Sequence, residues 1–161
     1  MTVVPIEDGR EVAAWPPELV RLYEDRYDEL VRLAYLLTGS AAVAEELVQD
    51  AFVATHAGWS RVREPLAYVR GAVVNRSRSW GRRVELERRR PPTPPEDARL
   101  EADELWDALA VLNDRQRAAI VLRYYDGLPD REIAAVLGCR VPTVRTAVHR
   151  GLAALRREIE R

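Results

Sequence analysis

The chain has 161 residues, 47% hydrophobic and 32% charged, and its 25 basic and 26 acidic residues leave a net charge of −1. This composition is that of one globular domain or two small ones, which excludes a large multi-domain enzyme and a disordered or collagen-like chain. One cysteine and two histidines exclude a disulfide framework and a four-cysteine zinc site, so we expect neither a metal nor a cofactor. No apolar run approaches the ~20 residues that span a bilayer, and residues 1–10 lack the pattern of a secretory signal, so we expect a cytoplasmic protein.

Charge alternates in blocks along the chain. Residues 1–58 hold 4 Arg and 11 acidic residues, whereas residues 59–90 hold 10 Arg and 3 acidic residues. Residues 91–114 then hold 1 Arg and 7 acidic residues, and residues 115–161 hold 10 Arg and 5 acidic residues. Acidic blocks suit a basic protein surface and arginine blocks suit nucleic acid, although a solvated helix face could explain any single block.

Two amphipathic helices are predicted at the start of the chain. Apolar residues recur at steps of three and four between Leu19 and Leu37, and Gly39 ends that helix. Ser40 is placed to cap the second helix, which ends at Gly58. The predicted buried stripe of the second helix consists of Ala44, Leu47, Val48, Ala51, Phe52 and Thr55.

A third helix and a proline-rich segment follow. The helix is expected from about Leu66 to beyond Arg83, because Pro65 suits the first turn of a helix, and its exposed side is predicted to be arginine-rich. Residues 91–97 read PPTPPED, which cannot continue a helix and favours an extended linker that could hold two domains roughly 30 Å apart. The fold class is therefore predicted to be all-α, with two small helical domains joined by this linker.

The second domain carries the pattern of a helix-turn-helix. It is expected to begin near Leu105, and residues 133–138 (IAAVLG) followed by residues 141–145 (VPTVR) have the required spacing. The second helix of this unit is predicted to bury Val144, Val148, Leu152 and Leu155. The outer residues at its amino-terminal end, which such a helix presents to base edges and phosphates, are Thr143, Arg145, Thr146, His149 and Arg150. A helical hairpin without DNA-binding function is the alternative.

The strings taken together resemble the extracytoplasmic-function (ECF) branch of the bacterial sigma-70 family, and most of all its actinobacterial SigE-like group. The marks of the resemblance are residues 34–39 (AYLLTG), 44–52 (AEELVQDAF), 65–70 (PLAYVR), 74–76 (VNR), 122–128 (LRYYDGL) and the helix-turn-helix. Their order and spacing carry the resemblance, which spans about residues 19–157. It implies a non-enzymatic sigma factor that directs promoter-specific transcription initiation.

The resemblance also implies a division of the chain and a set of partners. Residues 1–17 would be a tail, residues 18–90 region 2, residues 91–103 an acidic linker and residues 104–161 region 4. The expected partners are promoter DNA and core RNA polymerase, through its beta-prime clamp coiled coil and its beta flap, and such proteins are often held by an anti-sigma factor. The implied contact residues for the clamp, on the second helix, are Glu46, Gln49, Asp50 and Val53.

Two promoter elements would be read by different domains. Region 2 would open and read the minus-10 element as a single strand, which calls for positive groups and for flat or polar side chains. The residues implied for this task are Trp59, Arg61, Arg63, Asn75, Arg76, Ser79, Arg82 and Arg83. Region 4 would read the minus-35 element with the five outer helix residues. Trp59 and Tyr68 are more typical of packing residues than of stacking platforms, so Arg76 and Arg83 are the stronger candidates.

The chain departs from the family pattern at three places. In the third helix, Tyr68-Val69 stands where the family usually has Trp-Leu, and Gly71 and Gly81 each weaken that helix by about 1 kcal/mol relative to alanine. The recognition helix starts with residues 140–142 (RVP) in place of a small polar cap, and the linker carries four prolines. Two rival functions remain at this stage. One is an autonomous helix-turn-helix regulator that binds duplex DNA by itself; the other is a helical-bundle enzyme with a metal site made by Glu45, Glu46, Asp50 and His56.

Overall fold

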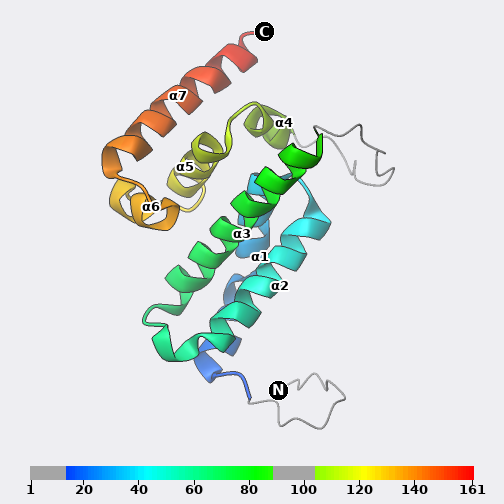
Figure 1. Ribbon diagram of the computed structural model, residues 1–161, viewed down its shortest axis with the longest axis vertical. Helices are drawn as coiled ribbons and strands as arrows, with labels where there is room; N and C mark the ends of the chain where they lie inside the picture. The colour runs from blue at the N-terminus through cyan, green and yellow to red at the C-terminus, as the bar shows by residue number, and fades with distance from the viewer. Residues whose placement is uncertain (1–13, 89–103) are drawn as a thin grey trace.

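The computed structural model describes residues 14–88 and 104–161. Figure 1 shows two helical groups, and neither described range contains a strand, as the all-α prediction requires. The first group consists of α1 (Pro17–Thr38), α2 (Ala41–Ala57), the short 3-10 helix η1 (Trp59–Arg61) and α3 (Pro65–Arg88). The second consists of α4 (Glu104–Ala110), α5 (Asp114–Tyr124), α6 (Asp130–Leu137) and α7 (Val141–Ile159). The predicted linker, residues 91–103, lies outside the described residues.

The first three helices form a bundle around one core. Every residue of the stripe predicted for α2 is buried, and Phe52 at its centre has no exposed surface. The predicted ends of the helices are also confirmed, because the Ser40 hydroxyl accepts a hydrogen bond of 3.3 Å from the Val43 N–H at the start of α2. Gly39 adopts φ of 74°, a left-handed conformation that glycine reaches without a steric penalty, and so ends α1.

Helix α3 begins at Pro65, one residue before the predicted start at about Leu66, and continues through both of its glycines to Arg88. Gly71 and Gly81 lie in open space, since an added Cβ atom at either position would have no neighbour within 4 Å. Neither glycine is therefore required by packing. Val69, Val73 and Val74 bury one side of the helix against α1 and α2.

The second group of helices is held by caps and by one half-buried arginine, Arg117. Asn113 and Gln116 form a capping box at the start of α5, with hydrogen bonds of 2.9 and 3.2 Å to each other's backbone N–H. Arg117 donates to the carbonyls of Leu109 (3.0 Å) and Leu112 (2.7 Å), which ties α5 to the end of α4. Its guanidinium also lies 5.0 Å from the ring centroid of Trp106. These bonds satisfy carbonyls that a helix end leaves without intrahelical partners.

The buried face predicted for the recognition helix α7 is partly wrong. Val144 and Val148 are buried and Leu155 packs against the core, but Leu152 is 39% exposed. Ala147 and Gly151 are buried instead. These two small residues let α7 approach α5 so closely that a Cβ atom on Gly151 would lie 2.5 Å from Ile120 Cδ1. Ala147 and Gly151 therefore occupy the centre of the contact between α7 and α5, and Leu152 lies at the edge of this contact.

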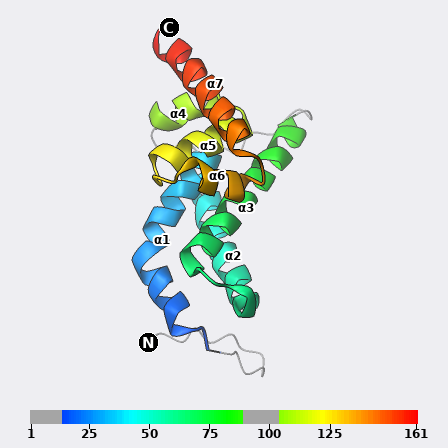
Figure 2. The same cartoon turned by 90° about the vertical axis from the view of Figure 1, so that its left-hand side faces the viewer.

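The two helical groups pack against each other. Figure 2 shows α5 and α6 at one end of the bundle, where they contact α1 and α3. The Trp106 ring lies directly against Gly39, where a side chain would leave it no room. None of the helices in the described ranges is long and apolar enough to cross a membrane.

Candidate polymerase and nucleic-acid interfaces

Helix α2 presents an acidic face with an apolar residue at one end. Glu46, Gln49, Asp50 and Val53 are all exposed, Val53 by 58%, and their spacing of three, four and seven residues places them on one side of the helix. Within the described residues none of the four makes a hydrogen bond or an ion pair. The opposite side of the helix is anchored in the core by Phe52. The four side chains are thus free to meet a partner on a rigid helix, and their chemistry suits a basic surface.

Two aromatic side chains from outside α2, Trp15 and Tyr23, pack on its carboxyl-terminal half, and the sequence did not predict these contacts. Trp15 stacks on His56 at a centroid distance of 5.3 Å, and Tyr23 meets Phe52 edge-on at 5.0 Å. The metal-site rival finds no support here, since His56 faces a ring and the described ranges contain no cluster of three His, Cys, Asp or Glu residues suited to a metal.

The residues proposed for the minus-10 element divide between a groove and the open surface. A groove of about 940 Å³ is lined by Arg63, Asn75 and Arg76 together with Tyr68, and is closed on one side by residues of α6. Trp59 is half-buried in η1 and packs against the core, as expected for a packing residue. The other residues proposed for the minus-10 element are exposed and do not line the groove. They are Arg61, Ser79, Arg82 and Arg83.

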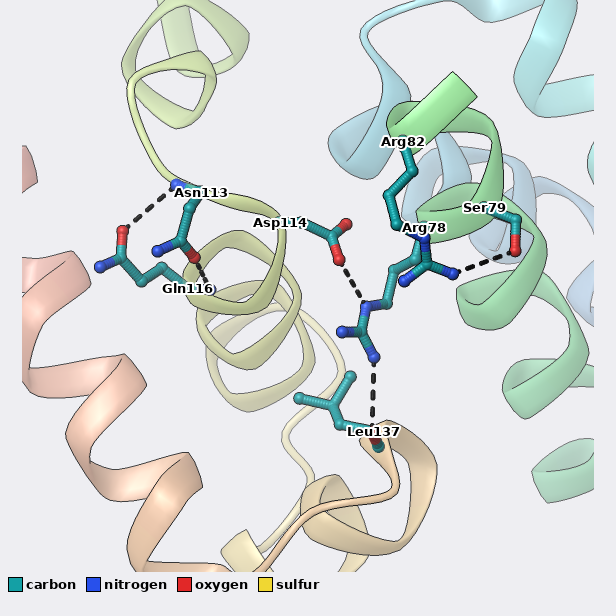
Figure 3. Close-up of polar contacts among 7 residues, drawn as sticks. All are labelled: Arg78, Ser79, Arg82, Asn113, Asp114, Gln116 and Leu137. Atoms are coloured by element: carbon teal, nitrogen blue, oxygen red, sulfur yellow. Dashed lines mark hydrogen bonds and ion pairs between the residues drawn. The ribbon is translucent and has the colours of Figure 1, made fainter. Parts of the chain in front are cut away.

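The exposed side of α3 carries arginines, as predicted, but two further arginines of this helix lie outside that side. Arg82 is exposed and donates a 3.3 Å hydrogen bond to the Ser79 hydroxyl (Figure 3). Arg70 and Arg78, by contrast, are 16% and 13% exposed and form ion pairs with residues of the second domain. Each directly follows a buried residue of α3, so each lies at the edge of the buried stripe. That position was the only sequence signal of their burial.

The two ion pairs connect α3 with both ends of α5. The Arg70 Nε atom lies 2.9 Å from Asp126 Oδ2, and the Arg78 Nε atom lies 2.8 Å from Asp114 Oδ2. Burial raises the pKa of Asp126, an effect that the charge of Arg70 opposes. Asp114 stands at the amino-terminal end of α5, where a negative charge is also favoured by the helix dipole.

The residues proposed for the minus-35 element share one face of α7. Arg145, Thr146, His149 and Arg150 are exposed and Thr143 is half-buried. Arg145 is paired with Asp130 of α6 at 3.3 Å. Thr143, Thr146 and Arg150 line a groove of about 650 Å³ whose other side is formed in part by Arg78 and Glu85 of α3.

Comparison with known proteins decides the family. The family model "Sigma-70 region 2" matches residues 22–85, and "Sigma-70, region 4" matches residues 102–155. The RNA polymerase sigma-E factor of Streptomyces coelicolor is 35% identical over 144 residues, which cover 83% of this chain and 81% of that protein. The chain belongs to the sigma-70 family. The match to region 2 covers the first half of this sigma factor. An autonomous helix-turn-helix regulator would not need that half of the chain.

Further relatives place the sigma factor within the family. The ECF RNA polymerase sigma factor SigE of Mycolicibacterium smegmatis is 35% identical over 172 residues, covering 92% of this chain and 63% of that protein. The sigma factor RpoE of Bartonella quintana, solved in complex with the anti-sigma factor NepR, has the same fold: the TM-score is 0.74 at 22% identity, over 90% of this chain and 98% of that one. The protein is therefore an ECF sigma factor, which directs transcription initiation and is not an enzyme.

Proposed function

We propose that this sigma factor divides its task among three helices: α2 binds core RNA polymerase, α3 reads the minus-10 element and α7 reads the minus-35 element. In this division residues 18–90 act as the region 2 domain and residues 104–161 as the region 4 domain. The observation that carries the proposal is the separation of charge in one bundle. The free acidic face lies on α2, whereas the arginines lie on α3 and the loop before it.

The face of α2 is proposed to bind the clamp coiled coil of the beta-prime subunit. Glu46 and Asp50 supply charge for a basic partner helix, and Val53, which is 58% exposed, supplies apolar area that a partner would remove from water. An exposed valine next to unpaired carboxylates is more typical of a binding interface than of a surface exposed only to solvent.

The groove beside α3 is proposed to hold unpaired bases of the minus-10 element. Arg63 and Arg76 can neutralise the backbone, Asn75 can hydrogen-bond a base edge, and the Tyr68 ring, 40% exposed, can stack on a base. Arg83 and Arg82, further along the exposed helix, extend the positive surface along the strand. Trp59 contributes by anchoring the 3-10 helix η1, which also carries Arg61, on the core.

On α7, the outer residues from Thr143 to Arg150 are proposed to enter the major groove of the minus-35 element. Two further partners fit region 4 and the bundle. Leu152 and Ile159, which are 39% and 79% exposed and seven residues apart on α7, offer an apolar site for the beta flap. An anti-sigma factor is proposed because the fold matches that of a sigma factor solved with one. Since RNA polymerase works in the cytoplasm, we place the protein there.

The proposal is tested by separating DNA opening from polymerase binding. Replacing Arg76 and Arg83 together by alanine is expected to abolish open-complex formation and to leave binding to core polymerase almost unchanged. Open complexes are measured by permanganate reactivity of unpaired thymines and by run-off transcription, and core binding by pull-down. The matched control replaces Arg21 and Arg161, two exposed arginines outside these surfaces, and should retain both activities.

The reverse variant completes the test. Asp50→Arg should weaken core binding at least about tenfold by placing like charges in the interface, whereas Asp28→Arg, on the exposed surface of α1, should not. Loss of core binding in the Arg76 and Arg83 variant, or its retention in the Asp50 variant, would contradict the proposed division.

A further inference from the structure

A carboxylate in the second domain connects α5, α6 and α7, which pack against one another (Figure 1). Asp130 is the first residue of α6, and its side chain is only 16% exposed. The Nη2 atom of Arg123, on α5, lies 3.3 Å from its Oδ1 atom and 3.4 Å from its Oδ2 atom. The Nε–H of Arg145, on α7, donates to the same Oδ2 atom over 3.3 Å. One acidic residue is therefore shared by an arginine of α5 and an arginine of the recognition helix.

The position of the Asp130 carboxylate is fixed by its surroundings. Its Oδ1 atom is buried, and Arg123 holds it from the side of α5. The amino-terminal end of α6 also favours a negative charge through the helix dipole. Arg145, by contrast, is 70% exposed, and an ion pair with so exposed a partner adds little to the stability of a fold. The pair is therefore explained better by the orientation that it gives Arg145 than by stability.

The bond to Asp130 leaves the outer edge of the Arg145 guanidinium available. It uses the Nε–H, and both Nη groups are without a partner in the part of the chain that the structure describes. These two groups form a planar fork that matches the N7 and O6 acceptors of guanine in the major groove. A side chain that is already held in place loses less conformational freedom when it binds. Arg145 is thus prepared for a base contact, which requires one orientation.

Arg150 provides the contrast on the same helix. It is exposed, and it has no hydrogen bond or ion pair within residues 14–88 and 104–161. A freely moving guanidinium is well suited to a phosphate, a contact that positions the protein but carries no sequence information. Of these two arginines on the outer face of α7, only Arg145 has a carboxylate that sets its direction.

We infer that Asp130 is a positioning residue for promoter recognition, which orients Arg145 to read a guanine of the minus-35 element. The inference rests on the proposed role of α7 and adds the base that is read and the residue that sets this choice. Asp130 acts through Arg145 and not on the DNA, because its Oδ1 atom is buried and its Oδ2 atom is taken by two arginines. Loss of either Asp130 or Arg145 should therefore relax the choice of base at the same position.

The experiment measures base preference with the complete chain bound to core RNA polymerase. Duplexes randomised over both promoter elements are selected by this holoenzyme and sequenced. The original protein should prefer guanine at one minus-35 position by about tenfold, as expected for a bidentate arginine contact. Arg145→Ala should remove this preference, and Asp130→Asn should reduce it to about threefold or less at the same position. The control Asp107→Asn makes the same charge change at an exposed residue in the first turn of α4, and should keep the preference.

Salt dependence separates positioning from a merely structural role. Holoenzyme binding is measured over a range of salt concentrations on the selected duplex and on a duplex in which the preferred guanine is replaced. Asp130→Asn removes a negative charge and frees Arg145 for a phosphate, so the slope of log K against log salt should steepen by about 0.9. Binding to the duplex without the guanine should stay equal or become tighter. Damage to the domain would instead weaken binding to both duplexes.

A second variant keeps the test independent of helix stability. Asp130→Glu retains the charge at the start of α6 but moves the carboxylate by one CH₂ group, so that it no longer meets Arg145 in the same place. It should relax the guanine preference as Asp130→Asn does, without the steeper salt dependence. Should Asp130→Asn fail to fold by circular dichroism, Asp130→Glu gives the result on base preference.

Three results would overturn the positioning role and leave the proposed function standing. The first is a guanine preference that both Asp130 variants keep at full strength while Arg145→Ala loses it. The second is a guanine preference that survives Arg145→Ala. The third is a loss of preference in the Asp130 variants that comes with equally weakened binding to both duplexes. An original protein that selects no base at any minus-35 position would instead contradict the proposed role of α7, and the positioning role with it.

Discussion

Two glycines inside helices of this protein provide matched tests of how packing limits helix stability. Gly81 of α3 lies in open space, whereas Gly151 of α7 faces Ile120 and Gln116 of α5. Replacing either glycine by alanine gives about 1 kcal/mol from helix propensity. At Gly81 nothing opposes this gain, so we expect Gly81→Ala to raise the free energy of unfolding by about 1 kcal/mol.

At Gly151 the added methyl group meets buried atoms. Its carbon would lie 2.5 Å from Ile120 Cδ1 and 3.3 Å from Gln116 Cβ, and Ile120 is only 6% exposed, so it has little room to shift. Overpacking of this kind costs typically about 1–3 kcal/mol, which exceeds the gain in propensity. We therefore expect Gly151→Ala to lower the free energy of unfolding by about 1 kcal/mol.

Urea denaturation followed by circular dichroism and tryptophan fluorescence measures both effects. Ile120→Val supplies the decisive control, because it removes the Cδ1 methyl group that the new side chain would meet. Alone it should cost about 0.5–1.5 kcal/mol, but in the Gly151→Ala background it should cost less or stabilise, a coupling of about 1 kcal/mol. Equal stabilisation by the two alanine substitutions, with no coupling to position 120, would refute the close approach of α7 to α5.

Two further predictions concern a helix cap and a buried carboxyl group. Asn113→Ala removes the capping box of α5 and should lower the free energy of unfolding by about 1 kcal/mol in the same denaturation assay, whereas Asn113→Ser should restore most of it. Burial raises the pKa of Asp126; the charges of Arg70 and Arg26 oppose this rise, and the charge of Glu29 adds to it. At a pH just above the ordinary carboxyl pKa of about 3.9, the protein with packed domains therefore binds more protons than the protein with separated domains. Domain packing should accordingly weaken as the pH rises through that range, and Asp126→Asn should remove this pH dependence. X-ray scattering profiles of the original protein and of the Asp126→Asn variant, measured across mildly acidic pH, test the prediction. Packing that strengthens as the pH rises would contradict it.

The local structure of this protein follows closely from its sequence. Three local features were predicted: the buried stripe of α2, the serine cap at its start and the glycines at helix ends. Each depends on residues close together in the sequence, where the helical period and the allowed backbone conformations favour one local structure. The family resemblance likewise depends on short strings whose order is visible along the chain. The ends of α1 and α2, the buried side of α2 and the sigma-70 assignment were therefore predictable, whereas Tyr23, which the apolar spacing placed in the buried stripe of α1, is 36% exposed.

Contacts between distant residues were decided only by the tertiary structure. Periodicity shows which side of a helix is buried but not which neighbour covers it, so Leu152 was predicted inside although Ala147 and Gly151 make the contact with α5. Arg78 and Asp114 are separated by 36 positions, and nothing in either local sequence indicates that they meet. Their pairing depends on how two separately folded groups of helices pack, because charged side chains at the edge of a buried stripe take whichever partner that packing brings near.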